Sequence, residues 1–230
     1  MLSRLRGWII PHFCLLCGTP VEGSPSADLP LCSRCLSDLA AIGGERCAVC
    51  GKELFSEKGT CYACREAYHT CSEVYPIFRY RAEPAALLRR YKSAKRASLA
   101  KFWAGLMAGI IAARWPDHAV VPVPPRPEKL RRHEWDQVEA IAACLEKMGF
   151  RVERVLARST AVQQKHLSRT MRKSNAEKGY FVIPGFARKV PDRVILIDDV
   201  YTTGATIDSC AKALLENGSQ KVAALVIAAD

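Results

Sequence analysis

The stretch "RVILIDDVYTTGATIDSCAKALLENGSQKVAALVIAA", residues 193–229, decides the fold. "RVILIDDV" contains a continuous apolar run that ends in two acids, as in parallel strands buried on both faces. "TIDSCAKALLENG" has a helical pattern with Gly218 at its C-terminal end, and "KVAALVIAA" predicts a last strand. This strand–helix–strand alternation predicts an open parallel α/β sheet with right-handed crossovers.

Upstream segments continue the alternation. Residues 73–81 predict a strand interrupted by Pro76, and the apolar spacing after it predicts helices broken near Lys92–Ser93. "AVVPVPP" predicts a buried strand that ends in a proline-fixed loop, "WDQVEAIAACLEKMG" an amphipathic helix closed by Gly149, and "VERVLAR" another strand. Residues 159–180 are polar and lack a periodic apolar face.

Four C-x-x-C pairs lie before residue 65. Two thiolates in a tight turn can meet one metal, and two such pairs complete a tetrahedron around zinc. "CLLCG" and "CAVCG" end in glycine whereas "LCSRC" and "CYACR" do not, and this repeat favours sequential sites over interleaved ones, which stay open. The sequential ligand sets are Cys14, Cys17, Cys32 and Cys35 for one zinc, and Cys47, Cys50, Cys61 and Cys64 for the other.

Sites made only of cysteine are structural, because catalytic zinc keeps a position for water. We therefore predict a zinc-binding domain over residues 1–72, folded largely by its metal, and an α/β domain over residues 73–230. A redox C-x-x-C is the minor alternative. His69 and Cys71 are interpreted as ordinary packing rather than spare ligands, and Cys144 and Cys210 as small apolar residues.

The composition is that of a soluble globular protein, with 49% hydrophobic and 25% charged residues. The formal net charge is +11, and residues 1–80 hold eight basic and eight acidic residues, so the excess lies in residues 81–230. A basic domain suits phosphate-bearing ligands, small or polymeric. The apolar piece before Pro11 is too short for a signal peptide and no stretch approaches a membrane span, so we expect a cytoplasmic protein without membrane insertion.

Asp198 and Asp199 stand at the carboxyl end of their predicted strand, where ligands bind in such sheets. Adjacent strand residues point to opposite sides, so the two carboxylates suit the hydroxyls of a sugar better than a side-by-side acid–base pair. The loop "YTTGAT" enters a helix, and its N–H groups and threonine hydroxyls suit one phosphate monoester. Together they predict a ribose 5-phosphate ligand, since neither a nucleotide P-loop nor a dinucleotide motif is present.

These motifs resemble those of known proteins. "VILIDDVYTTGAT", residues 194–206, is similar to the phosphoribosyl-pyrophosphate (PRPP) motif of type I phosphoribosyltransferases. With the cysteine pairs, nearly the whole chain resembles the ComF family of competence-associated proteins, in which zinc ribbons precede a phosphoribosyltransferase-like domain. "VPVPPRPEKLRRHEWDQ" and "QQKHLSRTMRKSNAEKGYF" are also similar to segments of that family.

The resemblance implies a type I phosphoribosyltransferase-like parallel sheet with helices on both faces, preceded by a double zinc ribbon. It implies that PRPP binds with magnesium and that a nitrogen nucleophile displaces pyrophosphate at the anomeric carbon. The catalytic pair that holds the ribose hydroxyls is then Asp198 and Asp199, and the 5-phosphate lies on Thr202, Thr203, Gly204, Ala205 and Thr206. Pyrophosphate or loop contacts are expected from Lys129, Arg131, Arg132, Arg169 and Arg172.

One segment departs from the family pattern. Where the family has Arg-Gly-Phe-Asn-Gln, this chain has "RHEWDQ", so His133 replaces a glycine and Asp136 an asparagine. A carboxylate added near a pyrophosphate repels it unless magnesium or arginine intervenes. We therefore expect this loop to serve pyrophosphate less well than in the family.

Three functions remain open. The first is a PRPP-binding, phosphoribosyltransferase-like protein associated with DNA uptake and its machinery. The second is a non-enzymatic adaptor for single-stranded DNA with a vestigial or sensory PRPP pocket, for which a basic patch at residues 89–96 and four aromatic residues offer contacts: Tyr62, Tyr68, Trp103 and Trp135. The third is a nucleobase salvage transferase. The sequence names no acceptor and no general base.

Overall fold

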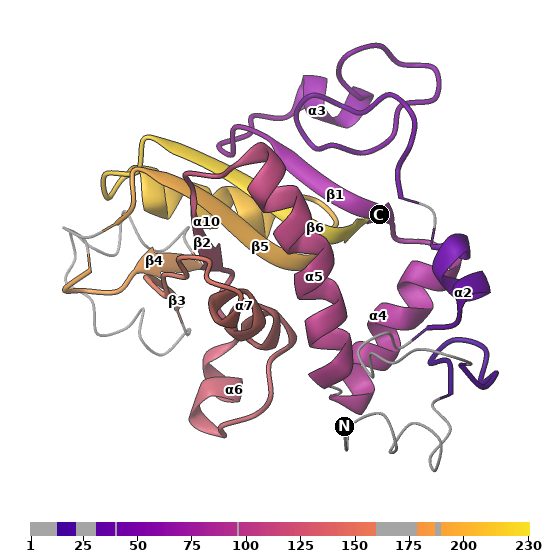
Figure 1. Cartoon of the computed structure of the whole chain (residues 1–230). Helices are drawn as coiled ribbons and strands as arrows, with labels where there is room; N and C mark the ends of the chain where they lie inside the picture. Colours follow the sequence, from indigo (N-terminus) through magenta and orange to yellow (C-terminus); the bar gives the residue numbers. More distant parts are fainter. Residues whose placement is uncertain (1–12, 22–30, 40, 96, 160–178, 187–189) are drawn as a thin grey trace.

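The computed structural model describes residues 13–21, 31–39, 41–95, 97–159, 179–186 and 190–230. Within these ranges, four strands form one parallel sheet in the order β1-β6-β5-β2 (Figure 1). Their bounds are Val74–Arg79 for β1, Ala119–Pro122 for β2, Arg193–Tyr201 for β5 and Lys221–Ala229 for β6. The predicted α/β class and its parallel sheet are confirmed.

The two central strands, β5 and β6, are the apolar runs from which the fold was predicted. Nearly every residue of β6 is buried, and β5 is buried continuously from Val194 to Ile197 before its two acids. The interruption predicted at Pro76 does not occur, because β1 runs through it. Among the described strands β1 pairs with β6 alone, and an edge strand can lose one N–H donor without breaking the sheet.

Helices cover both faces of the sheet (Figure 1). On one face, buried side chains of α4, α5 and α7 share a core with Ile195 and Ile197 of β5. On the other face, α10 shares a core with Val194 and Leu196, the alternate residues of the same strand. The helix bounds are Ala82–Ala94 for α4, Ala97–Arg114 for α5, Gln137–Lys147 for α7 and Ala205–Leu215 for α10.

The predicted break between the first two of these helices lies slightly later than expected. Helix α4 continues through Lys92 and Ser93 to Ala94, and Lys95 then takes a left-handed conformation with a φ of 49°. None of the described helices has both the length and the apolarity needed to cross a bilayer.

The strand predicted over "VERVLAR" is mostly wrong. Val152 makes one isolated parallel bridge to Val120, and only Leu156–Arg158 forms a strand, β3. Strand β3 pairs antiparallel with β4, Tyr180–Val182, in a separate two-stranded sheet. The intervening Arg154 explains the difference, because its guanidinium pairs with two glutamates of α7 at 2.7 and 3.0 Å and ties the segment to that helix.

Both cysteine-rich modules rest on the α/β domain (Figure 1). We call them the first ribbon, described at residues 13–21 and 31–39, and the second ribbon, residues 45–66. They contain the short helices α2, Ser33–Asp38, and α3, Tyr62–Glu66. The first ribbon is held to α4 by Arg90, which donates to the carbonyl of Leu15.

The second ribbon packs against the edge of the sheet. The N–H of Val74 in β1 donates to the carbonyl of Val49 at 2.9 Å, and Arg46 donates to the carbonyl of Pro76 at 2.7 Å. Gly51 lies so close to β1 that a Cβ atom there would overlap the carbonyl of Val74. The second ribbon is therefore joined to the strand that begins the α/β domain.

Candidate functional site

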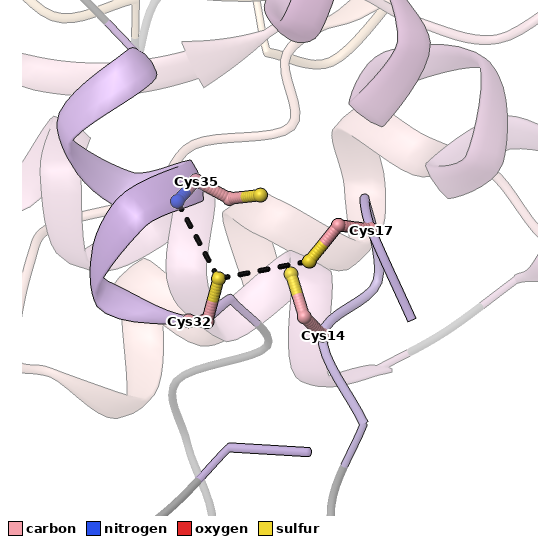
Figure 2. A group of neighbouring side chains, drawn as sticks. All are labelled: Cys14, Cys17, Cys32 and Cys35. Atoms are coloured by element: carbon pink, nitrogen blue, oxygen red, sulfur yellow. Dashed lines mark hydrogen bonds between the residues drawn. The ribbon is translucent and has the colours of Figure 1, made fainter. Parts of the chain in front are cut away.

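The first cysteine group consists of Cys14, Cys17, Cys32 and Cys35, whose sulfur atoms lie within 4.8 Å of one another (Figure 2). Two come from the turn at residues 14–18 and two from the start of α2. The Sγ atoms of Cys17 and Cys32 are 3.7 Å apart, and the N–H of Leu16 points at Sγ of Cys14 at 3.4 Å. These side chains converge on one point, as four ligands of a single ion do.

The second group consists of Cys47, Cys50, Cys61 and Cys64, again with sulfur atoms within 4.8 Å of one another. Burial alone would raise the pKa of the Cys47 thiol, but backbone N–H groups of Cys61, Cys50 and Val49 outweigh it and lower the pKa to about 6. The N–H of Cys61 lies 3.4 Å from this sulfur. At Cys47 the thiolate, the form that binds metal, is thus favoured at neutral pH, whereas burial raises the pKa of Cys50 to about 12.

The two glycine-ended turns have the same backbone geometry. Gly18 donates to the carbonyl of Cys14 at 2.9 Å, and Gly51 donates to that of Cys47 at 2.9 Å. Both glycines have positive φ, 75° and 66°. The structure thus assembles the two sequential groups rather than interleaved ones, and the donor set of four sulfurs with no open position fits structural zinc.

The remaining cysteines and His69 stand outside both groups. Cys71 and Cys210 are buried and belong to neither four-sulfur group, and burial raises the pKa of both thiols. His69 Nδ1 lies 3.2 Å from a carboxylate oxygen of Asp208 in α10. The described part of the chain therefore agrees with packing roles for these residues.

The loop after β5 has an exposed tip and a glycine with positive φ. Thr202 and Thr203 are exposed, and Gly204 precedes the first turn of α10 with a φ of 85°. No side chain caps this helix, and the N–H of Ala205 makes only a long contact of 3.5 Å with the hydroxyl of Thr203. Thr206 follows in the first turn. The loop that carries Thr202 and Thr203 therefore leads into the first amides of α10, and the N-terminus of a helix is where an anion is stabilised.

The two acids at the end of β5 have different surroundings. Asp199 is buried, and its Oδ2 accepts from the amide of Gln137 at 2.7 Å and from Lys92 Nζ at 3.0 Å. Asp198 accepts from the N–H of Asp199 at 2.8 Å. Burial and the neighbouring charge of Asp199 raise the pKa of Asp198 to about 7. At neutral pH Asp198 is therefore able to donate or accept a hydrogen bond, which suits contact with a hydroxyl group.

Sequence reasoning missed Lys92 as a partner of Asp199. It was expected only as part of the basic patch at residues 89–96, with no signal linking it to a residue 107 positions later. Gln137 is the last residue of "VPVPPRPEKLRRHEWDQ", the segment that is similar to the family, but its hydrogen bond to Asp199 was not predicted. Both side chains approach from helices that cover one face of the sheet, α4 and α7.

The predicted pyrophosphate contacts near "RHEWDQ" are mostly engaged within the chain. Lys129 Nζ lies 3.2 Å from a carboxylate oxygen of Asp136 and 3.2 Å from the side-chain oxygen of Gln137. Arg131 and Arg132 are exposed and make loose pairs of 3.5 and 3.6 Å with nearby glutamates. The predicted contacts from Arg169 and Arg172 lie outside the described residues.

The departure at Asp136 has a local explanation. Its Oδ1 caps α7 by accepting from the N–H groups of Val138 and Glu139 at 3.0 and 3.1 Å, and its other oxygen pairs with Lys129. Aspartate and asparagine are equally good at this position of a helix. His133 has the positive φ, 51°, that a glycine adopts more easily. The replacement of asparagine thus serves the helix, and its charge is compensated by the lysine.

A cavity of about 920 Å³ lies elsewhere, between the first ribbon and the start of α4. Its lining includes Cys17, Cys32, Arg34 and Glu83, and no residue of β5 or of the loop that follows. The size of this cavity therefore has no bearing on the acids and threonines of the loop.

Changing Gly204 to alanine is expected to destabilise the fold by about 1–3 kcal/mol more than the same change at Gly218. Both glycines have positive φ, 85° and 110°, so both variants carry backbone strain. A Cβ at Gly204 would also lie 2.9 Å from Cζ of Tyr201, whereas Gly218 has open space around it. Urea unfolding of the two variants measures the difference, and equal losses would show that the loop does not pack on Tyr201.

Comparison with known proteins supports the organisation derived above. The family model of the double zinc ribbon domain matches residues 5–65. The competence protein ComFC of Streptococcus pneumoniae is 28% identical over 91% of this chain and 96% of its own length. ComFC of Bacillus subtilis is 24% identical over 95% of each chain, and the DNA utilization protein YhgH of Salmonella typhimurium is 24% identical over 93% of this chain and 95% of its own. With two four-cysteine groups ahead of a parallel α/β sheet, the chain contains a double zinc ribbon and is similar to the ComFC proteins over more than nine-tenths of its length.

Proposed function

We propose that the chain binds PRPP with magnesium and acts as a phosphoribosyltransferase-like protein in DNA uptake. One observation carries the proposal: β5 holds two acids near its carboxyl end and leads, through Gly204 at a φ of 85°, into the uncapped start of α10. Acids that can hold hydroxyls, followed at once by amides that can hold an anion, suit a sugar phosphate better than either group alone.

In this proposal the 5-phosphate binds the amides and hydroxyls of residues 202–206, and the ribose hydroxyls contact Asp198 and Asp199. Lys92 and Gln137 hold the carboxylate of Asp199 in place, at 3.0 and 2.7 Å. Magnesium would be coordinated mainly by pyrophosphate and ribose oxygens, because it is usually bound through substrate phosphates and water rather than by protein ligands alone. It would neutralise the negative charge of the pyrophosphate leaving group.

The reaction that fits this arrangement is displacement at the anomeric carbon. The bond from that carbon to the pyrophosphate oxygen breaks, a bond to a nitrogen nucleophile forms, and the nitrogen loses its proton. The chain's own residues would position the ribose and stabilise the positive charge that develops on the ring, a role for which the carboxylates of Asp198 and Asp199 are suited. The acceptor is not identified by any described residue.

The association with DNA uptake is supported by the relatives. Two of them are named as competence proteins and one as a DNA utilization protein, and each matches more than nine-tenths of this chain. Similarity of this extent includes the ribbons and the α/β domain together. We therefore propose that both parts serve the handling of DNA taken up by the cell.

Isothermal titration calorimetry of the zinc-loaded chain with PRPP and magnesium tests the proposal. We expect saturable binding with one site per chain, weaker binding of ribose 5-phosphate, and competition between the two. Pyrophosphate release in the presence of single nucleobases then tests turnover. Absence of any heat of binding with PRPP would contradict the proposed ligand.

A DNA-binding adaptor is the second candidate, and the exposure of two tyrosines favours it. Tyr62 and Tyr68 are 71% and 91% exposed, although most large aromatic side chains are buried. The contacts predicted from Trp103 and Trp135 are not supported: Trp103 is buried in the core, and Trp135 packs edge-on against Tyr91 at 5.0 Å. Bases that stack on exposed aromatic rings gain about 1–3 kcal/mol each.

Replacing Tyr62 and Tyr68 together by serine is expected to weaken single-stranded DNA binding by about 10-fold or more, because two stacking platforms are lost. Filter binding of an oligonucleotide at low and moderate salt measures the affinity. Phe186, 40% exposed on the α/β domain, provides the control variant Phe186→Ser. No retention of DNA by the unaltered chain at low salt, or equal losses in the two variants, would eliminate this role for the tyrosines.

A further inference from the structure

The second ribbon reaches the loop that follows β5. Lys52, two residues after the ligand Cys50, donates from Nζ to the backbone carbonyl of Thr202 at 3.4 Å. The same ammonium lies 5.9 Å from the centre of the Tyr201 ring. A residue of the zinc-binding module thus touches the loop of the α/β domain, 150 positions away in sequence.

Tyr201 joins the loop to the ribbon. Its side chain is 4% exposed and shares a core with Cys47, Cys50 and Leu54 of the second ribbon. On its other side the ring lies against Gly204, where a Cβ atom would come within 2.9 Å of Cζ. The conformation of the loop is therefore supported through Tyr201 by the ribbon.

The segment that leaves the ribbon also holds the first turn of α10. The N–H groups of Thr70 and Cys71 donate to Oδ1 of Asp208 at 2.9 and 3.2 Å, and His69 contacts the other oxygen. Asp208 lies four residues after Gly204. The ribbon and its exit segment consequently fix the loop and the helix start relative to Lys52.

Charge and exposure distinguish Lys52 from a residue that serves packing alone. The loop residues 202–206 carry no cation of their own. Lys52 is half-buried, and its ammonium has three N–H donors, one of which is directed at the carbonyl of Thr202. A phosphate on the amides of the loop would therefore have an ammonium group beside it that can offer further donors.

We propose that Lys52 binds the 5-phosphate of the ligand, so that the second ribbon forms one wall of the site. The inference rests on the proposed function and adds to it a residue from outside the α/β domain. It makes the ribbon a part of the binding site as well as a metal-stabilised module. It also assigns Lys52 to the 5-phosphate end of the ligand and not to the pyrophosphate end.

Calorimetric titration of the Lys52→Ala variant with PRPP and magnesium tests the assignment, with Lys58→Ala as the matched control. Lys58 belongs to the same ribbon and is exposed, so both variants lose one charge from one module. We expect Lys52→Ala to weaken PRPP and ribose 5-phosphate by about 10- to 100-fold and to leave the affinity for free pyrophosphate unchanged. Lys58→Ala should change none of the three affinities by more than about 2-fold.

Two further measurements keep the outcomes distinct. Zinc content and the melting temperature of each variant establish that the ribbon is intact, and Lys52→Gln replaces Lys52→Ala if the latter loses zinc. Binding by the unaltered chain with an unchanged affinity in the Lys52 variant would overturn the inference and leave the proposed function standing. An equal loss for PRPP and free pyrophosphate would also overturn the assignment to the 5-phosphate. Absence of binding by the unaltered chain would contradict the proposed function itself.

Discussion

Replacing Asp198 and Asp199 together by asparagine is expected to abolish PRPP binding, with a loss in affinity of at least about 100-fold. Each carboxylate would lose charge-assisted hydrogen bonds to ribose hydroxyls, worth about 1.5–3 kcal/mol apiece. The change of Asp199 to asparagine also removes the negative charge that pairs with Lys92 Nζ at 3.0 Å. Isothermal titration calorimetry with PRPP and magnesium measures the effect.

A control with the same change in charge lies at the opposite end of the strand. Asp192 directly precedes β5, and Asp117 is 77% exposed and makes only a distant pair with Arg193 at 3.8 Å. The double variant Asp117→Asn plus Asp192→Asn should bind PRPP with the affinity of the unaltered chain. If the Asp198 and Asp199 variant also retained that affinity, the carboxylates would have no role in holding the ribose.

Removal of zinc is expected to have the largest effect on stability. Structural zinc contributes on the order of 10 kcal/mol to the folding of small zinc modules, and the ribbons have few other means of closing their turns. We expect Cys50→Ser to lower the zinc content from two ions to one per chain and to lower the melting temperature. Elemental analysis and calorimetric melting measure these two quantities.

The chain supplies a matched cysteine control for this experiment. Cys144 is half-buried in α7 and belongs to neither group. Cys144→Ser should retain two zinc ions and melt close to the unaltered chain. If Cys50→Ser also retained two zinc ions, the second group would not be the four-ligand site proposed for it.

The ligand sets and the central strands were accessible from sequence because their causes are local. The turn after Cys14 and the turn after Cys47 each need a glycine with positive φ, and this repeat separated the two groups correctly. The apolar runs of β5 and β6 likewise reflect burial on both faces. A boundary at residue 72 stays a prediction, since the N–H of Ser72 already donates to the carbonyl of Val222 in β6.

The partners within the site were not accessible in the same way. Lys92 and Asp199 meet only because α4 lies across the end of β5, and no local pattern records that meeting. The segment before β3 was assigned to a strand from its apolar residues, while the pairing of Arg154 with α7 is a tertiary contact that no local pattern records. Asp136 looked unfavourable until its role as the helix cap was visible.

Binding of the sugar phosphate at the loop after β5 is tested by a crystal structure of the zinc-loaded chain with PRPP and magnesium. We expect the 5-phosphate within hydrogen-bond distance of the amides of residues 204–206, with the ribose hydroxyls on Asp198 and Asp199. A loop that stays empty at saturating ligand, or a phosphate bound elsewhere on the chain, would contradict it.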